Sequence, residues 1–164
     1  MPTDMFILLM GVTASGKSTV GGLLASSLGW PFYDGDEFHS ETNVAKMSSG
    51  IPLTDEDRAP WLAKLGEIVA RHSEAGESGV LACSALKQKY RSALSSAGDV
   101  VTVYLKAERG LVRQRLGSRR GHFMPAGLVE SQFLALEEPG DAITVPASWP
   151  PERIVRTIRL ELGI

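Results

Sequence analysis

Cysteine, net charge and long apolar runs are all scarce in this sequence, and each scarcity excludes a class of protein. Cys83 is the one cysteine among 164 residues, so no disulfide can form within the chain, which is compatible with a reducing cytosol. A formal net charge of −2 argues against a broad surface for nucleic acid or anionic membrane. The apolar run at residues 5–10 is too short to span a bilayer and lacks the basic residues of a signal peptide. We therefore expect a cytoplasmic protein with no nucleic-acid partner and no membrane association.

What the sequence does contain predicts one α/β domain over residues 1–164. Hydrophobic residues make up 43% and charged residues 22%, which is ordinary for a soluble globular protein. No repeat, linker or low-complexity segment divides the chain. Apolar runs of strand length alternate with helical periodicity, which predicts a parallel sheet with helices on both faces. Strands are expected at residues 5–10, 31–33, 80–83, 100–105 and 141–145, and helices at 17–28, 37–47, 55–75, 84–91, 108–118, 126–136 and 151–162.

Residues 11–18 fit the phosphate-binding loop, or P-loop, G-x-x-x-x-G-K-[ST]. The pattern stands between an apolar run and a helical segment, as this loop requires, whereas an ordinary glycine-rich turn would not need Lys17. Backbone amides of such a loop and the dipole of the following helix bind anionic oxygens. In this motif the lysine reaches the β- and γ-phosphates, and the hydroxyl that follows it is a ligand for Mg²⁺. The predicted nucleotide-binding residues are Gly11, Val12, Thr13, Ala14, Ser15, Gly16, Lys17, Ser18 and Thr19.

Two aspartates, Asp34 and Asp36, follow the second predicted strand at the edge where α/β sheets bind ligands. Taken alone, this segment reads as a solvated turn or a helix cap. Beside a P-loop, which needs a metal ion and a group that orients a nucleophile, we favour a functional pair. No aspartate ends the strand that contains Cys83, so the usual metal-orienting acid is missing there, which strengthens the case for Asp34 and Asp36 in its place.

Arginines supply candidate ligands for anionic groups. Arg58 lies in the first turn of a helix near the expected crevice, where its alternative role is a surface ion pair with Asp55 or Glu56. Arg113, Arg115, Arg119 and Arg120 precede the break at residues 121–125, which is typical of a mobile lid that closes over phosphates. A solvated basic helix face explains Arg113 and Arg115 equally well, whereas we favour the lid for Arg119. We place this lid at about residues 113–136.

Several separate segments resemble the gluconokinase family, and together they run nearly the length of the chain. The P-loop is shared by many enzymes, but the DRAPWL, CSALK and GHFM segments are much more specific. The segments are residues 11–19, 34–39, 46–47, 52–53, 57–62, 83–87, 90–91, 121–125 and 131–139.

The resemblance implies a three-layer P-loop kinase fold like that of nucleoside-monophosphate and shikimate kinases, with five parallel strands in the order 2-3-1-4-5. It also implies a dimer and a reaction in which ATP and D-gluconate give ADP and 6-phospho-D-gluconate, with Mg²⁺. The alternatives are another small-molecule kinase of this fold, acting on shikimate or a nucleotide, and a regulatory module that only binds nucleotide.

The expected mechanism gives each candidate residue a role. Lys17, Asp36 and Arg119 would be catalytic, with Asp36 accepting the proton of the C6 hydroxyl. Arg115 would contact the nucleotide, and the backbone around Pro146 is a candidate adenine contact. Ser18 would bind Mg²⁺ directly and Asp34 through water. The substrate would contact Asp36, His39, Arg58, Lys87 and Arg91, with Arg58 as the first choice for the carboxylate.

Overall fold

The computed structural model describes residues 4–118 and 126–164, and within them one parallel sheet forms the centre of the molecule. Its strand order is β2-β3-β1-β4-β5, and each neighbouring pair is parallel, which confirms the predicted order. β1 is central and buried on both faces, as expected for an uninterrupted apolar run. The strands are β1 (Phe6–Met10), β2 (Phe32–Asp34), β3 (Gly79–Ala82), β4 (Val100–Lys106) and β5 (Ile143–Pro146).

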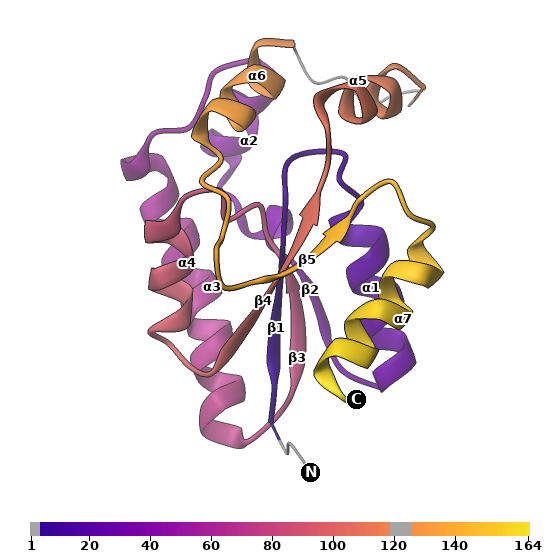
Figure 1. Ribbon diagram of the computed structural model, residues 1–164. Helices are drawn as coiled ribbons and strands as arrows, with labels where there is room; N and C mark the ends of the chain where they lie inside the picture. The colour runs from indigo at the N-terminus through magenta and orange to yellow at the C-terminus, as the bar shows by residue number, and fades with distance from the viewer. Residues whose placement is uncertain (1–3, 119–125) are drawn as a thin grey trace.

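Helices cover both faces of this sheet, so the fold has the three layers that the sequence predicts (Figure 1). Side chains alternate along β1: Ile7 and Leu9 pack toward α1 and α7, whereas Leu8 and Met10 pack toward α3 and α4. The four covering helices are α1 (Lys17–Leu28), α3 (Asp55–Ala75), α4 (Gln88–Ser95) and α7 (Pro151–Leu162). No helix in the described ranges is both long enough and apolar enough to cross a membrane.

Three further helices lie at the end of the sheet toward which its strands run (Figure 1). They are α2 (Glu41–Ser48), α5 (Arg109–Ser118) and α6 (Ala126–Ala135). Arg113 of α5 donates to Glu130 of α6 over 3.1 Å, and Arg109 lies 3.6 Å from the same carboxylate. The predicted lid spans α5 and α6, and its residues 119–125, which include Arg119, lie outside the described residues. The mobility of this lid therefore stays a prediction.

Local capping signals decide where several helices begin and end. Gly29 ends α1 with φ 70°, and Thr54 begins α3 through a capping box with Asp57. The predicted helix at 37–47 is instead a 3₁₀ turn, η1 (Gly35–Phe38), followed by α2, because Ser40 accepts the Asn43 amide and starts a new helix.

The helix predicted from residue 84 begins only at Gln88, which corrects its start. Residues 84–87 cross the end of the sheet in an irregular conformation, with Ala85 in the left-handed region at φ 44°. A non-glycine residue rarely adopts this conformation, and it prevents the helix from starting earlier. The segment therefore brings Ser84 and Lys87 to the edge of a cavity instead of into a helix.

Candidate active site

The P-loop joins β1 to α1 and has the backbone shape of an anion-binding site. Gly16 has φ 94° and Ala14 has φ 59°, both in the left-handed region. A Cβ at Gly11 would lie 2.9 Å from the Leu105 carbonyl oxygen and 2.7 Å from Ser15 Oγ, so only glycine fits there. The Lys17 ammonium donates to the Val12 carbonyl over 3.0 Å and thus lies across its own loop. Amides, helix dipole and ammonium together form a site for phosphate oxygens.

Ser18 and Asp34 meet where α1 starts beside the end of β2. Ser18 Oγ donates to Asp34 Oδ2 over 2.7 Å, and the Asp36 amide donates to Asp34 Oδ1 over 3.1 Å. Gly35 between the two aspartates passes close to β3, since a Cβ there would lie 2.8 Å from the Ala82 carbonyl oxygen. This tight turn directs Asp34 to the P-loop and Asp36 to the neighbouring cavity.

The Ser18–Asp34 pair fits a magnesium ion. A hydroxyl and a carboxylate are hard oxygen ligands, and Mg²⁺ is usually bound by one or two protein groups together with waters and substrate phosphates. Within residues 4–118 and 126–164, no cluster of three or more His, Cys, Asp or Glu side chains could hold a metal ion by itself. The Ser18–Asp34 pair supplies two oxygen ligands, which matches an ion that is bound together with nucleotide phosphates.

A cavity of about 620 Å³ connects the P-loop to residues from five other segments. This volume suits a small-molecule site. One end contains Thr13, Gly16, Lys17 and Ser18 of the P-loop. The remaining walls include Asp36, His39, Val44, Met47, Arg58, Trp61, Ser84, Lys87, Leu128 and Gln132. Predicted nucleotide and acceptor residues that are distant in sequence thus share one cavity.

His39 lies flat against Trp61, which fixes its ring at the cavity wall. The two rings stack with centroids 4.3 Å apart and planes inclined by 14°, and the Trp61 indole donates to the Gly35 carbonyl over 2.7 Å. Burial lowers the pKa of His39 below its ordinary value, an effect that Arg58 reinforces and Asp36 opposes. A neutral imidazole can donate or accept a hydrogen bond, which suits recognition of a hydroxyl.

Arg58 extends from the first turn of α3 into the cavity wall and is held at one nitrogen. Its Nη1 donates to the Leu53 carbonyl over 2.8 Å and to the Tyr90 hydroxyl over 3.2 Å. The alternative role, a surface ion pair with Asp55 or Glu56, is not what the contacts show, since Asp55 instead pairs with Lys89 and accepts from Tyr90. Arg58 is therefore a positioned cation in the cavity wall, in the same cavity as the other predicted substrate ligands Asp36, His39 and Lys87.

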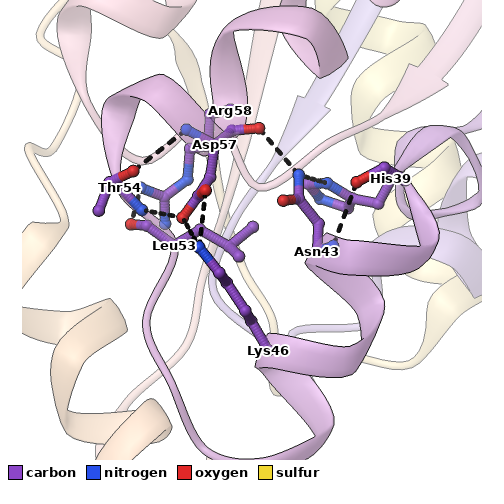
Figure 2. Close-up of polar contacts among 8 residues, drawn as sticks. His39, Asn43, Lys46, Leu53, Thr54, Asp57 and Arg58 are labelled. Atoms are coloured by element: carbon purple, nitrogen blue, oxygen red, sulfur yellow. Dashed lines mark hydrogen bonds and ion pairs between the residues drawn. The ribbon is translucent and has the colours of Figure 1, made fainter.

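Lys46 and Asp57 join α2 to the start of α3, directly beside Arg58 (Figure 2). Lys46 Nζ lies 2.8 and 3.0 Å from the two Asp57 oxygens, and Asn43 donates to the Asp57 carbonyl over 2.8 Å. Hydrogen bonds from Lys46 and from the Thr54 amide lower the pKa of Asp57 to about 2, so its charge persists at neutral pH. This network holds the two helices that form the outer wall of the cavity.

Arg91 occupies a structural position, which corrects its prediction as a substrate ligand. It is 4% exposed, and its guanidinium donates to the carbonyls of Ala85, Leu86 and Glu137 over 2.7, 3.0 and 2.7 Å. It does not line the cavity. Its donors are committed to fixing the irregular segment at residues 84–87 against the chain that follows α6.

Arg115 ties α5 to the nucleotide end of the cavity. Its Nη1 donates to the Ala14 carbonyl in the P-loop over 2.8 Å, and its Nη2 donates to the Ala147 carbonyl over 2.7 Å. Ala147 directly follows Pro146, the candidate adenine contact. Arg113 instead lies on the exposed face of α5, the alternative given above, where it pairs with Glu130.

Known proteins resemble this chain over most of its length. The shikimate kinase family model matches residues 13–135. A probable gluconokinase of Rattus norvegicus is 48% identical over 158 residues, which cover 85% of each chain. A gluconokinase of Gluconobacter oxydans is 48% identical over 139 residues, covering 83% of this chain and 77% of that one. A crystal structure of a gluconokinase from Sinorhizobium meliloti superposes with a TM-score of 0.88 at 40% identity, covering 98% of this chain and 93% of that one.

The chain belongs to the gluconokinase family. The resemblance found in its motifs is thereby confirmed, together with the P-loop kinase fold and the assignment as a kinase. As a gluconokinase-family member it carries its shared motifs on both sides of one cavity: the P-loop on one side, and residues of the DRAPWL and CSALK segments on the other.

Two contacts in this gluconokinase-family site were not predicted from the sequence. Gln132 of α6 accepts the Thr13 amide of the P-loop over 2.6 Å, although 119 positions separate the two residues. Lys46 of α2 pairs with Asp57 of α3. Both residues belong to segments that carried the family resemblance, so their presence there was the available signal, but nothing local indicated their partners.

Proposed function

We propose that this protein transfers the γ-phosphoryl group of ATP to the C6 hydroxyl of D-gluconate. The observation that carries the proposal is the shared cavity, in which a P-loop faces Asp36 and a positioned guanidinium, Arg58. Gluconate is our choice of acceptor substrate because relatives at 38–48% identity are named gluconokinase. The cavity has room for a sugar acid beside the phosphates.

Positioning and charge neutralisation account for most of the catalysis in such a transfer. The P-loop amides and Lys17 bind the β- and γ-phosphates, while Asp36 accepts a hydrogen bond from the C6 hydroxyl and then its proton. The bond from phosphorus to the ADP oxygen breaks as the bond to the gluconate oxygen forms, and the negative charge leaves with ADP. Mg²⁺ would be held by Ser18 and, through water, by Asp34, and would neutralise phosphate charge. Arg119, outside the described residues, is proposed to close over the phosphoryl group.

Recognition of gluconate divides between its carboxylate and its hydroxyls. Arg58 is our choice for the carboxylate, since a planar guanidinium matches it and no described residue is bonded to its Nε or Nη2. Lys87 lines the same cavity and adds positive charge. His39, stacked on Trp61 and with its pKa lowered by burial, binds a hydroxyl.

Arg58→Ala is expected to raise the KM for gluconate by about tenfold or more, because a charged hydrogen-bond partner of the carboxylate is lost. The KM for ATP should stay within about twofold, since Arg58 does not contact the P-loop. Steady-state kinetics with each substrate varied in turn measures both. Arg71→Ala, an exposed arginine of the same helix, is the matched control. An unchanged gluconate KM would remove Arg58 from the site.

ADP release measured with a panel of acceptors tests the function itself. We expect turnover with gluconate, little with shikimate or nucleoside monophosphates, and a phosphorus NMR signal for a phosphate monoester of gluconate. Preference for another acceptor would favour a different small-molecule kinase of this fold. Nucleotide binding without transfer to any acceptor would instead favour a regulatory module.

The homodimer implied by the resemblance and the cytoplasmic location expected from the composition stay predictions. Size-exclusion chromatography with light scattering measures the first. Cell fractionation with an antibody to the protein measures the second.

A further inference from the structure

Gln132 links α6 to the P-loop at the point where the nucleotide and acceptor ends of the cavity meet. Its Oε1 accepts the Thr13 amide over 2.6 Å, and both residues line the cavity that also contains Asp36 and Lys17. This contact is partly buried and spans 119 positions of sequence. The contact therefore belongs to the architecture of the site.

This hydrogen bond fixes which end of the carboxamide faces which neighbour. A backbone N–H can only donate, so the oxygen of Gln132 must point to Thr13 and the Nε2 group must point away from it. Within the described residues, no acceptor is bonded to Nε2. Two oriented N–H donors are thus left beside the P-loop in a partly buried position.

The chain that follows Gln132 holds it in place. After α6, the Glu137 amide donates to the Leu86 carbonyl over 2.8 Å, and the Glu137 carboxylate accepts the Gln88 amide at the start of α4 over 2.8 Å. Arg91 donates to the Glu137 carbonyl over 2.7 Å. α6 is therefore anchored at its end to the segment that carries Lys87, and Gln132 is positioned before any ligand arrives.

We propose that Gln132 is a catalytic residue whose Nε2 group donates hydrogen bonds to the γ-phosphoryl group during its transfer, while Thr13 holds the carboxamide in the required orientation. This inference rests on the proposed phosphoryl transfer. Negative charge on the equatorial oxygens of the transferred group needs preorganised donors, and an oriented amide supplies them without adding a charge that would have to be neutralised afterward.

A rival role has the opposite consequence for binding. If the Gln132 oxygen only occupies the Thr13 amide until phosphate displaces it, removing the side chain would strengthen binding of the γ-phosphoryl group. If Nε2 donates to that group, removing it weakens binding. The two roles therefore differ in the sign of one measurable change.

The deciding experiment compares the affinity for ADP with that for ADP plus beryllium fluoride, a mimic of the γ-phosphoryl group, by calorimetry in Mg²⁺. Beryllium fluoride should increase the affinity for ADP, and we call this increase the gain. In Gln132→Ala the gain should fall by about tenfold, as expected for the loss of hydrogen bonds to a charged acceptor, while the affinity for ADP alone stays within about twofold. Gln132→Met should behave alike, because it fills the same space without polar groups. Leu134→Ala, an 81% exposed residue of the same helix, is the control and should retain the full gain.

Turnover gives a second readout, since kcat with gluconate should fall by about tenfold or more in both Gln132 variants. An unchanged or increased gain from beryllium fluoride would overturn the role of Gln132. If the unaltered protein fails to phosphorylate gluconate, the proposed function fails, but the beryllium fluoride comparison still tests Gln132 because it requires no acceptor.

Discussion

Lys17→Met is expected to lower kcat by about 10³-fold or more, because phosphoryl transfer depends on charge neutralisation at the β- and γ-phosphates. Lys17 is the cation within the P-loop, and its ammonium is already held across the loop by the Val12 carbonyl 3.0 Å away. Methionine keeps most of the length and volume of the side chain and removes the charge. Steady-state ADP release at saturating ATP and gluconate measures the loss.

Lys64→Met is the matched control for this variant, since Lys64 is exposed on α3 and does not line the cavity. It removes the same charge from the protein and should leave kcat within about twofold. Thermal unfolding of both variants separates lost chemistry from lost folding. A Lys17→Met protein that kept kcat within about tenfold of the original would exclude this P-loop as the phosphate site.

The sheet and its P-loop could be predicted because their signals are local. The apolar run of β1, the glycines and lysine of residues 11–18 and the αL glycine Gly29 each act within a few positions of sequence. Alternation of strands and helices then limits the topology, since parallel crossovers are nearly always right-handed. The strand order itself came from the family resemblance, and the sheet confirms it.

The segment between β3 and α4 could not be predicted because tertiary contacts override its local preference. Residues 84–87 contain good helix formers, yet Arg91 draws the carbonyls of Ala85 and Leu86 into hydrogen bonds that an early helical turn would not allow. The same contacts turn Arg91 from a predicted substrate ligand into the support of the segment that carries Lys87. Helical periodicity contains no information about such a partner.

The contacts between elements that surround the cavity could not be predicted from the sequence either. Thr13 and Gln132 are 119 positions apart, and Lys46 and Asp57 lie on different helices, so no local pattern connects either pair. Both pairs connect elements that form opposite sides of the site. The residue types at the site could therefore be predicted from motifs, whereas the hydrogen bonds that orient them required the folded chain.

Asp36→Asn is expected to lower kcat by about 10²-fold or more if Asp36 accepts the proton of the acceptor hydroxyl. The aspartate lines the cavity, and its backbone amide is fixed by Asp34, so asparagine should keep the same position. An amide oxygen still accepts a hydrogen bond from the hydroxyl but does not take its proton. The KM for gluconate should therefore change much less than kcat, and steady-state kinetics separates the two.

Glu37→Gln is the matched control, because it neutralises the adjacent carboxylate, which is exposed and does not line the cavity. It should leave kcat within about twofold, which shows that loss of one negative charge near the site is not enough. Asp34→Asn should differ from both, since Asp34 faces Ser18 and its loss should raise the Mg²⁺ concentration needed for half-maximal rate. Near-full kcat in Asp36→Asn would restrict Asp36 to orienting the hydroxyl, because a base that is lost cannot be replaced by an amide.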